Sequence, residues 1–422
     1  MNAVHTASLR LPKASIIIAP AWHSCGSYRV FRAQVEAHKA AGIAPYFLAI
    51  HPHFAVLGGG GGLWKKYRKN TADLGTVDRG EARLPWLNFF KPSFLSSLAT
   101  ARKRTPVFTK SLSATHALLP ASLAQFMASH EIVAIHCNHY FNLPAAKRVQ
   151  ALAPGARIIL ETHDIQSFHV RQERPVNPLT LRREPFARYF EDEVAISQAA
   201  DELIHLNHEE FEAFSAALPG KSHHLIYPSL GRPAASTAPP PVRDIDFLVL
   251  GAANRGNFHS LKWFLSEVWD ERLAAAANLA IVGGVADLFK VFNPSLYRKY
   301  SASFKGSVAD VGAWYGRAKT VLLPISEGHG IAIKTLEAFA HAKPVIYTAQ
   351  ALRGFDREPV VKNLPGFAAT ADEFKARLQA AICSPPAALS EGAAAAAGIY
   401  EALFSPETYH AKLAAVLLGG QA

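Results

Sequence analysis

The chain has 422 residues, of which 50% are hydrophobic and 18% are charged. This balance excludes an intrinsically disordered chain, and the length predicts two domains of about 200 residues each. Its three cysteines, Cys25, Cys137 and Cys383, lack the spacing of a metal site and indicate reduced thiols in a cytosol-like compartment. No run of about 18 apolar residues is present, so we expect neither a membrane-spanning helix nor a cleaved leader.

The formal net charge of +11 favours acidic partners, which are nucleotide phosphates, an anionic membrane surface or nucleic acid. The cluster WKKYRK, Trp64 to Lys69, interleaves aromatic and basic side chains, as membrane-surface segments do. A solvated loop explains the same cluster. We predict a cytoplasmic protein without a nucleic-acid partner, and peripheral contact with the inner face of the membrane is a further hypothesis.

Short apolar runs alternate with helical patterns along the first half of the chain. Such alternation predicts βαβ units and parallel sheets. A helix is predicted over 30–42, and the five consecutive glycines Gly58 to Gly62 mark a loop. The predicted strands of this half are 14–20, 45–50, 132–137, 157–164 and 200–207.

The composition changes at the proline-rich segment 227–244, which is typical of an interdomain linker. Strand patterns then resume at 245–252, 279–284, 320–325 and 343–348. We therefore predict an α/β protein with two doubly wound, Rossmann-like domains that face each other across a cleft. The predicted boundaries are 1–227 for the first domain, 228–243 for the linker, 244–395 for the second domain and 396–422 for a C-terminal helix that packs back toward the first domain.

Ligands of open parallel sheets bind beyond the carboxyl ends of the strands, so the loops that follow strands hold the candidate site. The loop SEGHG follows the strand over 320–325, and a helix is predicted to begin near Ile331. Gly328 and Gly330 expose backbone N–H groups in this loop, and the helix start adds the positive end of its dipole. The combination predicts an anion site.

Lys334 and Glu337 follow on the first two turns of that helix. Lys334 adds a full positive charge, and the Glu337 carboxylate is suited to accept hydrogen bonds from a ribose diol. A solvent-exposed i, i+3 ion pair between the two residues explains the same spacing without any ligand.

A longer sequence match favours the ligand-binding interpretation over the exposed ion pair. Residues 324–355, PISEGHGIAIKTLEAFAHAKPVIYTAQALRGF, resemble the donor-site signature of family 4 glycosyltransferases of the GT-B fold. The segments 247–273 and 304–324 are similar to neighbouring parts of the same donor domain, and 161–168, ETHDIQSF, resembles a strand end that carries an active-site His-Asp pair. The resemblance covers most of the second half of the chain and patches of the first.

The resemblance implies an acceptor domain followed by a donor domain, and transfer of a sugar from a nucleotide donor with retained anomeric configuration. It implies no required metal and no cofactor, because the nucleoside diphosphate sugar is a substrate. Many members place two glutamates with seven residues between them, whereas nine separate Glu327 from Glu337. Either Glu327 reaches the site on a longer loop, or His329 replaces it.

Residue roles follow from the same resemblance. In the donor domain it implies that Gly328, Gly330, Ile331, Lys334, Glu337, Arg255 and Asn257 bind the donor. Arg255 is the expected second cation for the diphosphate, because a leaving diphosphate needs positive charge beside it. A solvated arginine in a loop is the alternative.

In the first domain the resemblance makes His163 a contact of the donor sugar, with Asp164 beside it. A buried core histidine and a helix cap are the alternatives for these two residues. Gly26 and Ser27 belong to a loop near the diphosphate or the acceptor, and Asn138 and His139 end a strand on the acceptor side.

The leading hypothesis is a retaining glycosyltransferase that acts on a glycan, lipid-linked or protein acceptor. The alternatives are a nucleotide-sugar epimerase or a phosphorylase of the same fold, or a catalytically silent module that binds sugar or nucleotide.

Overall fold

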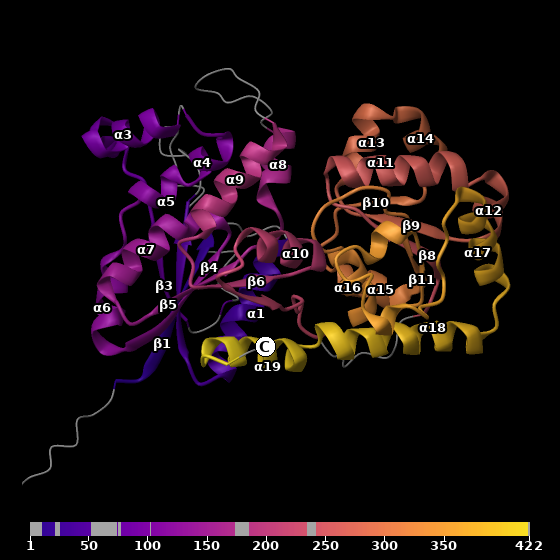
Figure 1. The fold of residues 1–422 in the computed structure, drawn as a ribbon. Coiled ribbons are helices and arrows are strands. Elements are labelled where there is room, and N and C mark those ends of the chain that lie inside the picture. The colour runs from indigo at the N-terminus through magenta and orange to yellow at the C-terminus, as the bar shows by residue number, and fades with distance from the viewer. Residues whose placement is uncertain are drawn as a thin grey trace, which may run out of the picture. The chain divides into compact units, whose positions relative to one another are not determined.

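The structure, a computed structural model, describes residues 11–21, 26–51, 74, 77–101, 103–173, 185–233 and 242–420. The WKKYRK cluster, Gly58 to Gly62 and residues 234–241 of the proline-rich segment lie outside the described residues. The chain divides into two compact units (Figure 1). The first unit comprises Met1–Pro228 with Tyr409–Ala422, and the second comprises Ser229–Thr408.

The first unit is built on a seven-stranded sheet in which every pair of neighbours is parallel, in the order β3-β2-β1-β4-β5-β6-β7. The predicted strands of this half are confirmed. The strands are β1 (Lys13–Pro20), β2 (Ala44–Ile50), β3 (Asp78–Ala82), β4 (Glu131–Asn138), β5 (Arg157–Glu161), β6 (Glu202–His205) and β7 (Ser222–Leu225).

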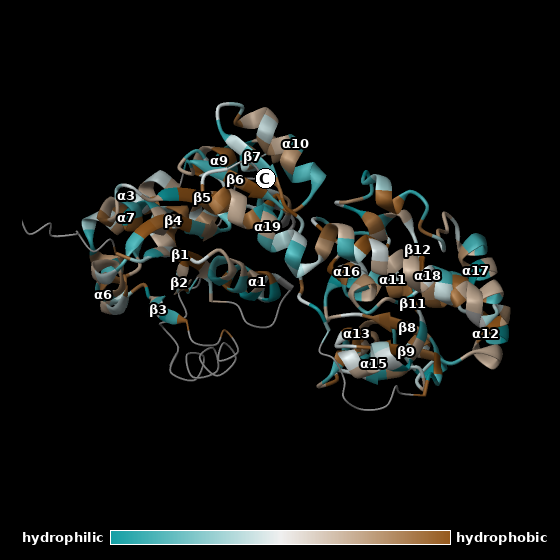
Figure 2. Ribbon diagram, turned by 90° about the horizontal axis from the view of Figure 1, so that it is seen from below, coloured by the Kyte–Doolittle hydropathy of each residue, from teal (hydrophilic) through white to brown (hydrophobic). Residues whose placement is uncertain are grey.

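Helices cover both faces of this sheet, and for this reason its central strands are continuous apolar runs (Figure 2). One face packs under α6, α7, α9 and α10, and the other packs against α1 and α19. The helical segments are α1 (Gly26–Ala40), η3 (Trp86–Phe90), α3 (Pro92–Ala101), α4 (Pro106–Lys110), α5 (Leu112–His116), α6 (Ala121–Ser129), η4 (Tyr140–Asn142), α7 (Leu143–Leu152), α8 (Gln166–Glu173), α9 (Phe186–Ser197), α10 (His208–Ala217) and α19 (Pro406–Leu417).

The second unit has a five-stranded parallel sheet in the order β10-β9-β8-β11-β12. Its strands are β8 (Ile245–Leu250), β9 (Leu279–Val282), β10 (Phe304–Gly306), β11 (Ala318–Leu323) and β12 (Val345–Tyr347). Its helical segments are α11 (Arg255–Trp263), η5 (Phe264–Val268), α12 (Glu271–Ala276), α13 (Val285–Phe292), α14 (Pro294–Lys299), α15 (Val311–Arg317), α16 (Ile333–Ala340), η6 (Ala349–Leu352), η7 (Pro359–Val361), α17 (Ala371–Cys383), α18 (Pro386–Ile399) and η8 (Tyr400–Phe404).

The strand order reverses once in each sheet, between β1 and β4 in the first unit and between β8 and β11 in the second. Loops leave these strand pairs in opposite directions, and the crevice between them is where doubly wound sheets bind ligands. Each unit therefore has one preferred edge for a site, at the carboxyl ends of its reversal strands.

The C-terminal segment differs from the prediction of one helix over 396–422. Residues 396–404 complete α18 and η8 in the second unit, and the extended residue Ser405 separates them from α19. Tyr409 and Leu413 of α19 are buried in the first unit, where the Arg157 guanidinium donates to the carbonyl of Leu417 at 2.7 Å. Pro406 cannot continue the preceding helix, which accounts for the break.

Candidate functional site

The loop between β11 and α16 is shaped by two glycines. Gly328 has φ 148° and Gly330 has φ 65°, which are conformations that favour glycine. A Cβ atom on Gly328 would lie 2.9 Å from Cζ of Arg353, so the absence of a side chain lets this guanidinium approach the loop. Arg353 also donates through Nε to the carbonyl of His329 at 3.4 Å.

Helix α16 begins at Ile333, two residues later than the sequence predicts. Ile331 and Ala332 are buried before the helix starts, so packing of the extended chain delays the first turn. The residue at the N-cap is Ala332, which provides no side-chain hydrogen bond to the first helical amides. The positive end of the helix is therefore uncapped by a side chain and suits an anion.

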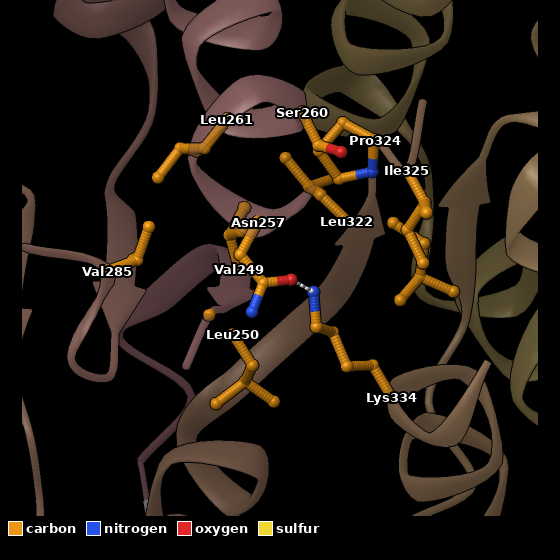
Figure 3. Close-up of a pocket in the computed structure, with 12 residues that line it drawn as sticks. Val249, Leu250, Asn257, Ser260, Leu261, Val285, Leu322, Pro324, Ile325 and Lys334 are labelled. Atoms are coloured by element: carbon orange, nitrogen blue, oxygen red, sulfur yellow. Dashed lines mark hydrogen bonds between the residues drawn. The ribbon is translucent and has the colours of Figure 1, made fainter. Parts of the chain in front are cut away.

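Lys334 points from α16 toward α11, where its ammonium group donates to Oδ1 of Asn257 (Figure 3). Asn257 is held in place by its own Nδ2, which donates to the Ala252 carbonyl at 2.9 Å. Burial, reinforced by the nearby Arg353 guanidinium and opposed by Glu337, lowers the pKa of Lys334 to about 8. Burial also lowers the pKa of Arg353.

Lys334 and Arg353 thus bring two cations to the start of α16, and each disfavours the charge of the other. An anion placed between them relieves this repulsion and replaces the water that burial has removed. Sequence reasoning missed Arg353. It lies sixteen residues beyond Glu337 and follows β12. Because β12 lies beside β11 in the sheet, the chain after β12 returns to the loop that follows β11.

Glu337 lies one turn after Lys334 and is half-buried. The Tyr315 hydroxyl of α15 lies 3.5 Å from its Oε2 and donates toward it. Tyr315 is itself buried, and its ring stacks on His341 with 4.2 Å between centroids. The carboxylate therefore stands beside a phenol that the core holds rigidly.

A small pocket lies beside this helix at the carboxyl ends of β8 and β11, which is the reversal point of the second sheet (Figure 3). Its polar lining includes Asn257, Ser260 and Lys334, and its other walls are mainly apolar. The remaining lining residues are Val249, Leu250, Gly251, Leu261, Val285, Leu322, Leu323, Pro324 and Ile325.

The loops after β8 and β9 approach each other backbone to backbone beside the pocket. Gly283 has φ 118°, and a Cβ atom there would lie 2.3 Å from the carbonyl oxygen of Gly251. A Cβ atom on Gly251 would lie 2.8 Å from Cγ1 of Val285. The absence of side chains at Gly251 and Gly283 is what allows these two loops to pack so closely. Gly283 is a second position that sequence reasoning did not select.

Three predicted site residues, the donor-binding Arg255 and the catalytic candidates Glu327 and His329, lie at the rim of the same edge. Arg255 is the first residue of α11, where it is exposed and has no hydrogen-bond partner within the described ranges. Glu327 forms an ion pair with His259 of α11, with Oε1 and Nδ1 3.2 Å apart, and both side chains are nearly half exposed. His329 lies closer to the helix start and is half-buried.

The first unit gathers polar residues at its own reversal edge. Asn138 ends β4, and its Oδ1 lies 2.6 Å from Nε2 of His163 and 2.7 Å from Nε2 of Gln34. The His139 ring stacks on the His163 ring with 4.3 Å between centroids. His139 and His163 both have positive φ, 61° and 66°. Such non-glycine strain is concentrated at functional sites.

His163 directs Nε2 into the buried cluster, whereas its Nδ1 has no hydrogen-bond partner in the part of the chain that the structure describes. Asp164 accepts a hydrogen bond from the Gln166 side chain. The first amides of α8, those of Gln166 and Ser167, donate to the Glu193 carboxylate at 3.0 and 2.7 Å. Glu193 therefore caps this helix in place of Asp164. Gly26 and Ser27 form the first turn of α1.

Behind His163 runs a buried chain of polar groups that sequence reasoning missed. Ser15 Oγ lies 2.6 Å from Nδ1 of His38, and His38 Nε2 lies 3.0 Å from Nδ1 of His136. His136 Nε2 then lies 3.1 Å from Oε2 of Glu161, whose Oε1 is 3.5 Å from His163 Nε2. If both histidine rings are neutral, one set of tautomers satisfies every hydrogen bond: Ser15 donates to His38, His38 donates to His136, and His136 donates to Glu161.

The charges along this chain follow from burial. Burial lowers the pKa of His38 well below its usual value, and the neighbouring His136 lowers it further. Burial raises the pKa of Glu161, but the hydrogen bond from His136 and the charge of His163 outweigh it, so the net pKa is lowered. Burial lowers the pKa of His163 against the opposing charges of Glu161 and Asp164. A carboxylate thus faces His163 from inside the core.

One Asp-x-Asp sequence, Asp244 to Asp246, occurs in the chain, and the fold keeps it apart from this site. It lies at the amino end of β8, opposite the reversal edge. The Arg317 guanidinium donates to Asp244 at 2.8 and 2.5 Å, and Lys319 donates to Asp246 at 2.8 Å. These ion pairs connect α15 and β11 to the start of β8.

Comparisons with known proteins agree with this architecture. Residues 244–384 match the family model described as Glycosyl transferases group 1. No curated protein sequence matches the chain. No helix in the described ranges has the length and apolarity needed to cross a bilayer.

Solved structures with the same fold cover nearly the whole chain at low identity. Sucrose-phosphate synthase from Thermosynechococcus elongatus aligns with a TM-score of 0.59 and 14% identity, over 96% of this chain and 98% of that chain. Anabaena Alr3699/HepE in complex with UDP and glucose aligns with a TM-score of 0.58 and 12% identity, over 96% and 100%. The lipopolysaccharide outer core galactosyltransferase WaaB aligns with a TM-score of 0.57 and 12% identity, over 96% and 99%.

The two parallel sheets and these similarities define the GT-B fold, and residues 244–384 form a glycosyl transferases group 1 domain. The family match and the fold support a glycosyltransferase, as the resemblance in the sequence implied.

Proposed function

We propose that the protein is a retaining, metal-independent glycosyltransferase that moves a sugar from a nucleoside diphosphate sugar to a glycan, lipid-linked or protein acceptor. The observation that carries the proposal is the convergence of Lys334 and Arg353 at the uncapped start of α16. Negative charge develops on the diphosphate as the glycosidic bond breaks, and fixed cations and amides stabilise it there.

The donor is bound in three parts under this proposal. Lys334, Arg353 and the amides near Gly328 and Gly330 bind the diphosphate, with exposed Arg255 as a further cation. Glu337 accepts hydrogen bonds from the ribose diol, held beside Tyr315. The loops after β8 and β9, which lie at the carboxyl edge of the same sheet, are the proposed location of the base.

The edge of the first unit supplies the groups for the sugar. His163 offers its Nδ1 to the transferred sugar, while Asn138 and Glu161 fix the other ring nitrogen. His139 stacks on that ring, and Gly26 and Ser27 border the acceptor side. The two cations on the donor side supply the charge that a divalent metal supplies in other transferases, which supports metal independence. We also propose that the enzyme acts in the cytoplasm.

Donor turnover without an acceptor tests the proposal. UDP-glucose is the first donor to try, because Alr3699/HepE is described in complex with UDP and glucose. We expect slow release of UDP that persists in a chelator, with the α-anomer of glucose as the first product seen by NMR. Release of the β-anomer contradicts retention, and loss of turnover in the chelator contradicts metal independence.

The same assay separates the alternatives. An epimerase converts the donor to an isomeric nucleotide sugar without net release of UDP. A phosphorylase releases sugar phosphate only when inorganic phosphate is added. Binding of UDP-glucose without any turnover, with or without a panel of glycan and lipid acceptors, identifies a silent module and overturns the proposal.

A further inference from the structure

An exposed apolar surface lies on the first unit, in the segment that follows β3. We call it the η3–α3 surface, and it consists of Trp86, Leu87, Phe90 and Leu95. Their exposed fractions are 52%, 57%, 72% and 54%. Large apolar side chains that cluster while exposed mark an interaction surface. The rings of Trp86 and Phe90 lie edge to face, 6.1 Å apart, so these two side chains form a continuous apolar surface.

The segment under this surface is anchored firmly, so its exposure is built into the fold. Phe94 is buried and contacts Phe89 at 5.0 Å between centroids. Asn88, also buried, donates to the His116 carbonyl at 2.7 Å, and His116 Nε2 lies 2.9 Å from the Ser97 hydroxyl. Asn88 and Phe94 face inward, and Trp86, Leu87, Phe90 and Leu95 of the same segment are left exposed.

All the charged side chains of the segment that carries this surface are basic. Between Ala82 and His130 the sequence contains no Asp and no Glu, and its basic residues there are Arg83, Lys91, Arg102, Lys103, Arg104 and Lys110. Arg83 is paired with Glu81 and Arg104 with Asp192. Lys91, between η3 and α3, and Lys103, just after α3, are exposed and form no ion pair within the described ranges.

We propose that the η3–α3 surface docks the protein on an anionic lipid bilayer. Tryptophan, phenylalanine and leucine insert at the level of the headgroups, and lysines beside them bind the anionic lipid phosphates. The exposed lysines beside the apolar side chains complement the negative charge of such a bilayer, and the segment carries no acidic side chain. The inference goes beyond the proposed function and uses none of its site residues.

Co-sedimentation of the full chain with vesicles tests the inference. We expect binding to phosphatidylcholine vesicles that contain phosphatidylserine, weaker binding to phosphatidylcholine alone, and weaker binding as salt is raised. The double variant Trp86→Ala/Phe90→Ala should bind at least about tenfold more weakly. The matched control is Val291→Ala/Phe292→Ala, because these two residues of α13 are each 70% exposed on the second unit.

Three outcomes overturn the inference. The first is equal binding by both double variants and the native chain. The second is loss of binding only when the basic residues of Trp64 to Lys69 are changed. The third is self-association of the native chain in sedimentation without vesicles, together with a monomeric Trp86→Ala/Phe90→Ala variant. That result would identify a second copy of the chain as the occupant of the surface. The UDP affinity of this variant is measured alongside and should equal that of the native protein. A failure of the lipid-docking inference can therefore be distinguished from a failure of the proposed function.

Discussion

The ammonium group of Lys334 donates to Oδ1 of Asn257, seventy-seven residues earlier in the chain. This bond joins the first turn of α16 to the first turn of α11 across the reversal point of the second sheet (Figure 3). It keeps a cation with a pKa of about 8 in place before any ligand arrives. A preorganised cation of this kind loses little orientational freedom when a diphosphate binds.

Lys334→Ala should weaken UDP binding by about 10- to 100-fold. This factor corresponds to the free energy of about 1.5–3 kcal/mol that a hydrogen bond to a charged group contributes. Isothermal titration calorimetry measures the change. The matched control is Lys290→Ala, because Lys290 is an exposed lysine of the same unit that pairs with Asp287. Equal affinity of Lys334→Ala and the native protein contradicts the assignment.

The pH dependence of UDP affinity follows from the pKa of Lys334. The diphosphate binds the protonated ammonium, so binding raises this pKa above its free value of about 8. Affinity should therefore be constant below about pH 8 and fall above it, by up to about tenfold per pH unit. Lys334→Arg does not titrate in this range and should remove the fall. A fall of the same size in Lys334→Arg assigns the titration to another group.

Gly328→Ala should displace Arg353 and strain the loop, because its Cβ would lie 2.9 Å from Cζ at φ 148°. We expect a loss of about 1–3 kcal/mol in the free energy of unfolding and weaker UDP binding. Denaturant titration and calorimetry measure the two effects. Gly155→Ala, with no atom within 4 Å of the new Cβ, serves as control. Native UDP affinity in Gly328→Ala shows that Arg353 does not bind the diphosphate.

Glu337→Ala should remove the discrimination between UDP and its 2′-deoxy analogue. The carboxylate is proposed to accept hydrogen bonds from the ribose diol, and each such bond contributes about 1.5–3 kcal/mol because the acceptor is charged. UDP binding should weaken about 10- to 100-fold, and binding of the deoxy analogue should weaken less. Equal losses for both nucleotides indicate that Glu337 acts on the loop rather than on the ribose.

Glu161→Gln keeps the shape of the buried chain and removes its charge. We expect kcat to fall about tenfold, a fraction of the ~10² to 10⁴ that a positioned acid–base group contributes, with donor affinity unchanged. The pKa of His163 should also fall, because Glu161 opposes the effect of burial on it. NMR of the histidine ring protons measures this shift, which a purely structural role does not produce. Exposed Glu131→Gln is the control.

Sequence reasoning located the parts of the fold that local pattern determines. Uninterrupted apolar runs such as those of β1 and β11 predict buried parallel strands, because both faces of such strands are covered. Gly328 and Gly330 mark the anion loop, since their positive φ values need glycine. The start of α16 was predicted two residues early, because burial of Ile331 and Ala332 is a tertiary effect.

The missed residues depend on contacts between distant segments. Arg353 reaches the anion loop only because β12 runs parallel to β11 and returns the chain to the same edge. His38, His136 and Glu161 come from three separate elements, and the fold brings them into hydrogen-bond contact. The sequence contains 19 histidines, and nothing in its pattern distinguishes His38 or His136 from the others. Spacing along one segment carries no signal for such contacts.

A crystal structure of the protein with UDP tests the central claim most directly. The account predicts the diphosphate at the start of α16, within hydrogen-bond distance of Lys334, Arg353 and the loop amides, with Glu337 on the ribose hydroxyls. A nucleotide bound elsewhere, or a diphosphate at this helix that neither cation contacts, would contradict it.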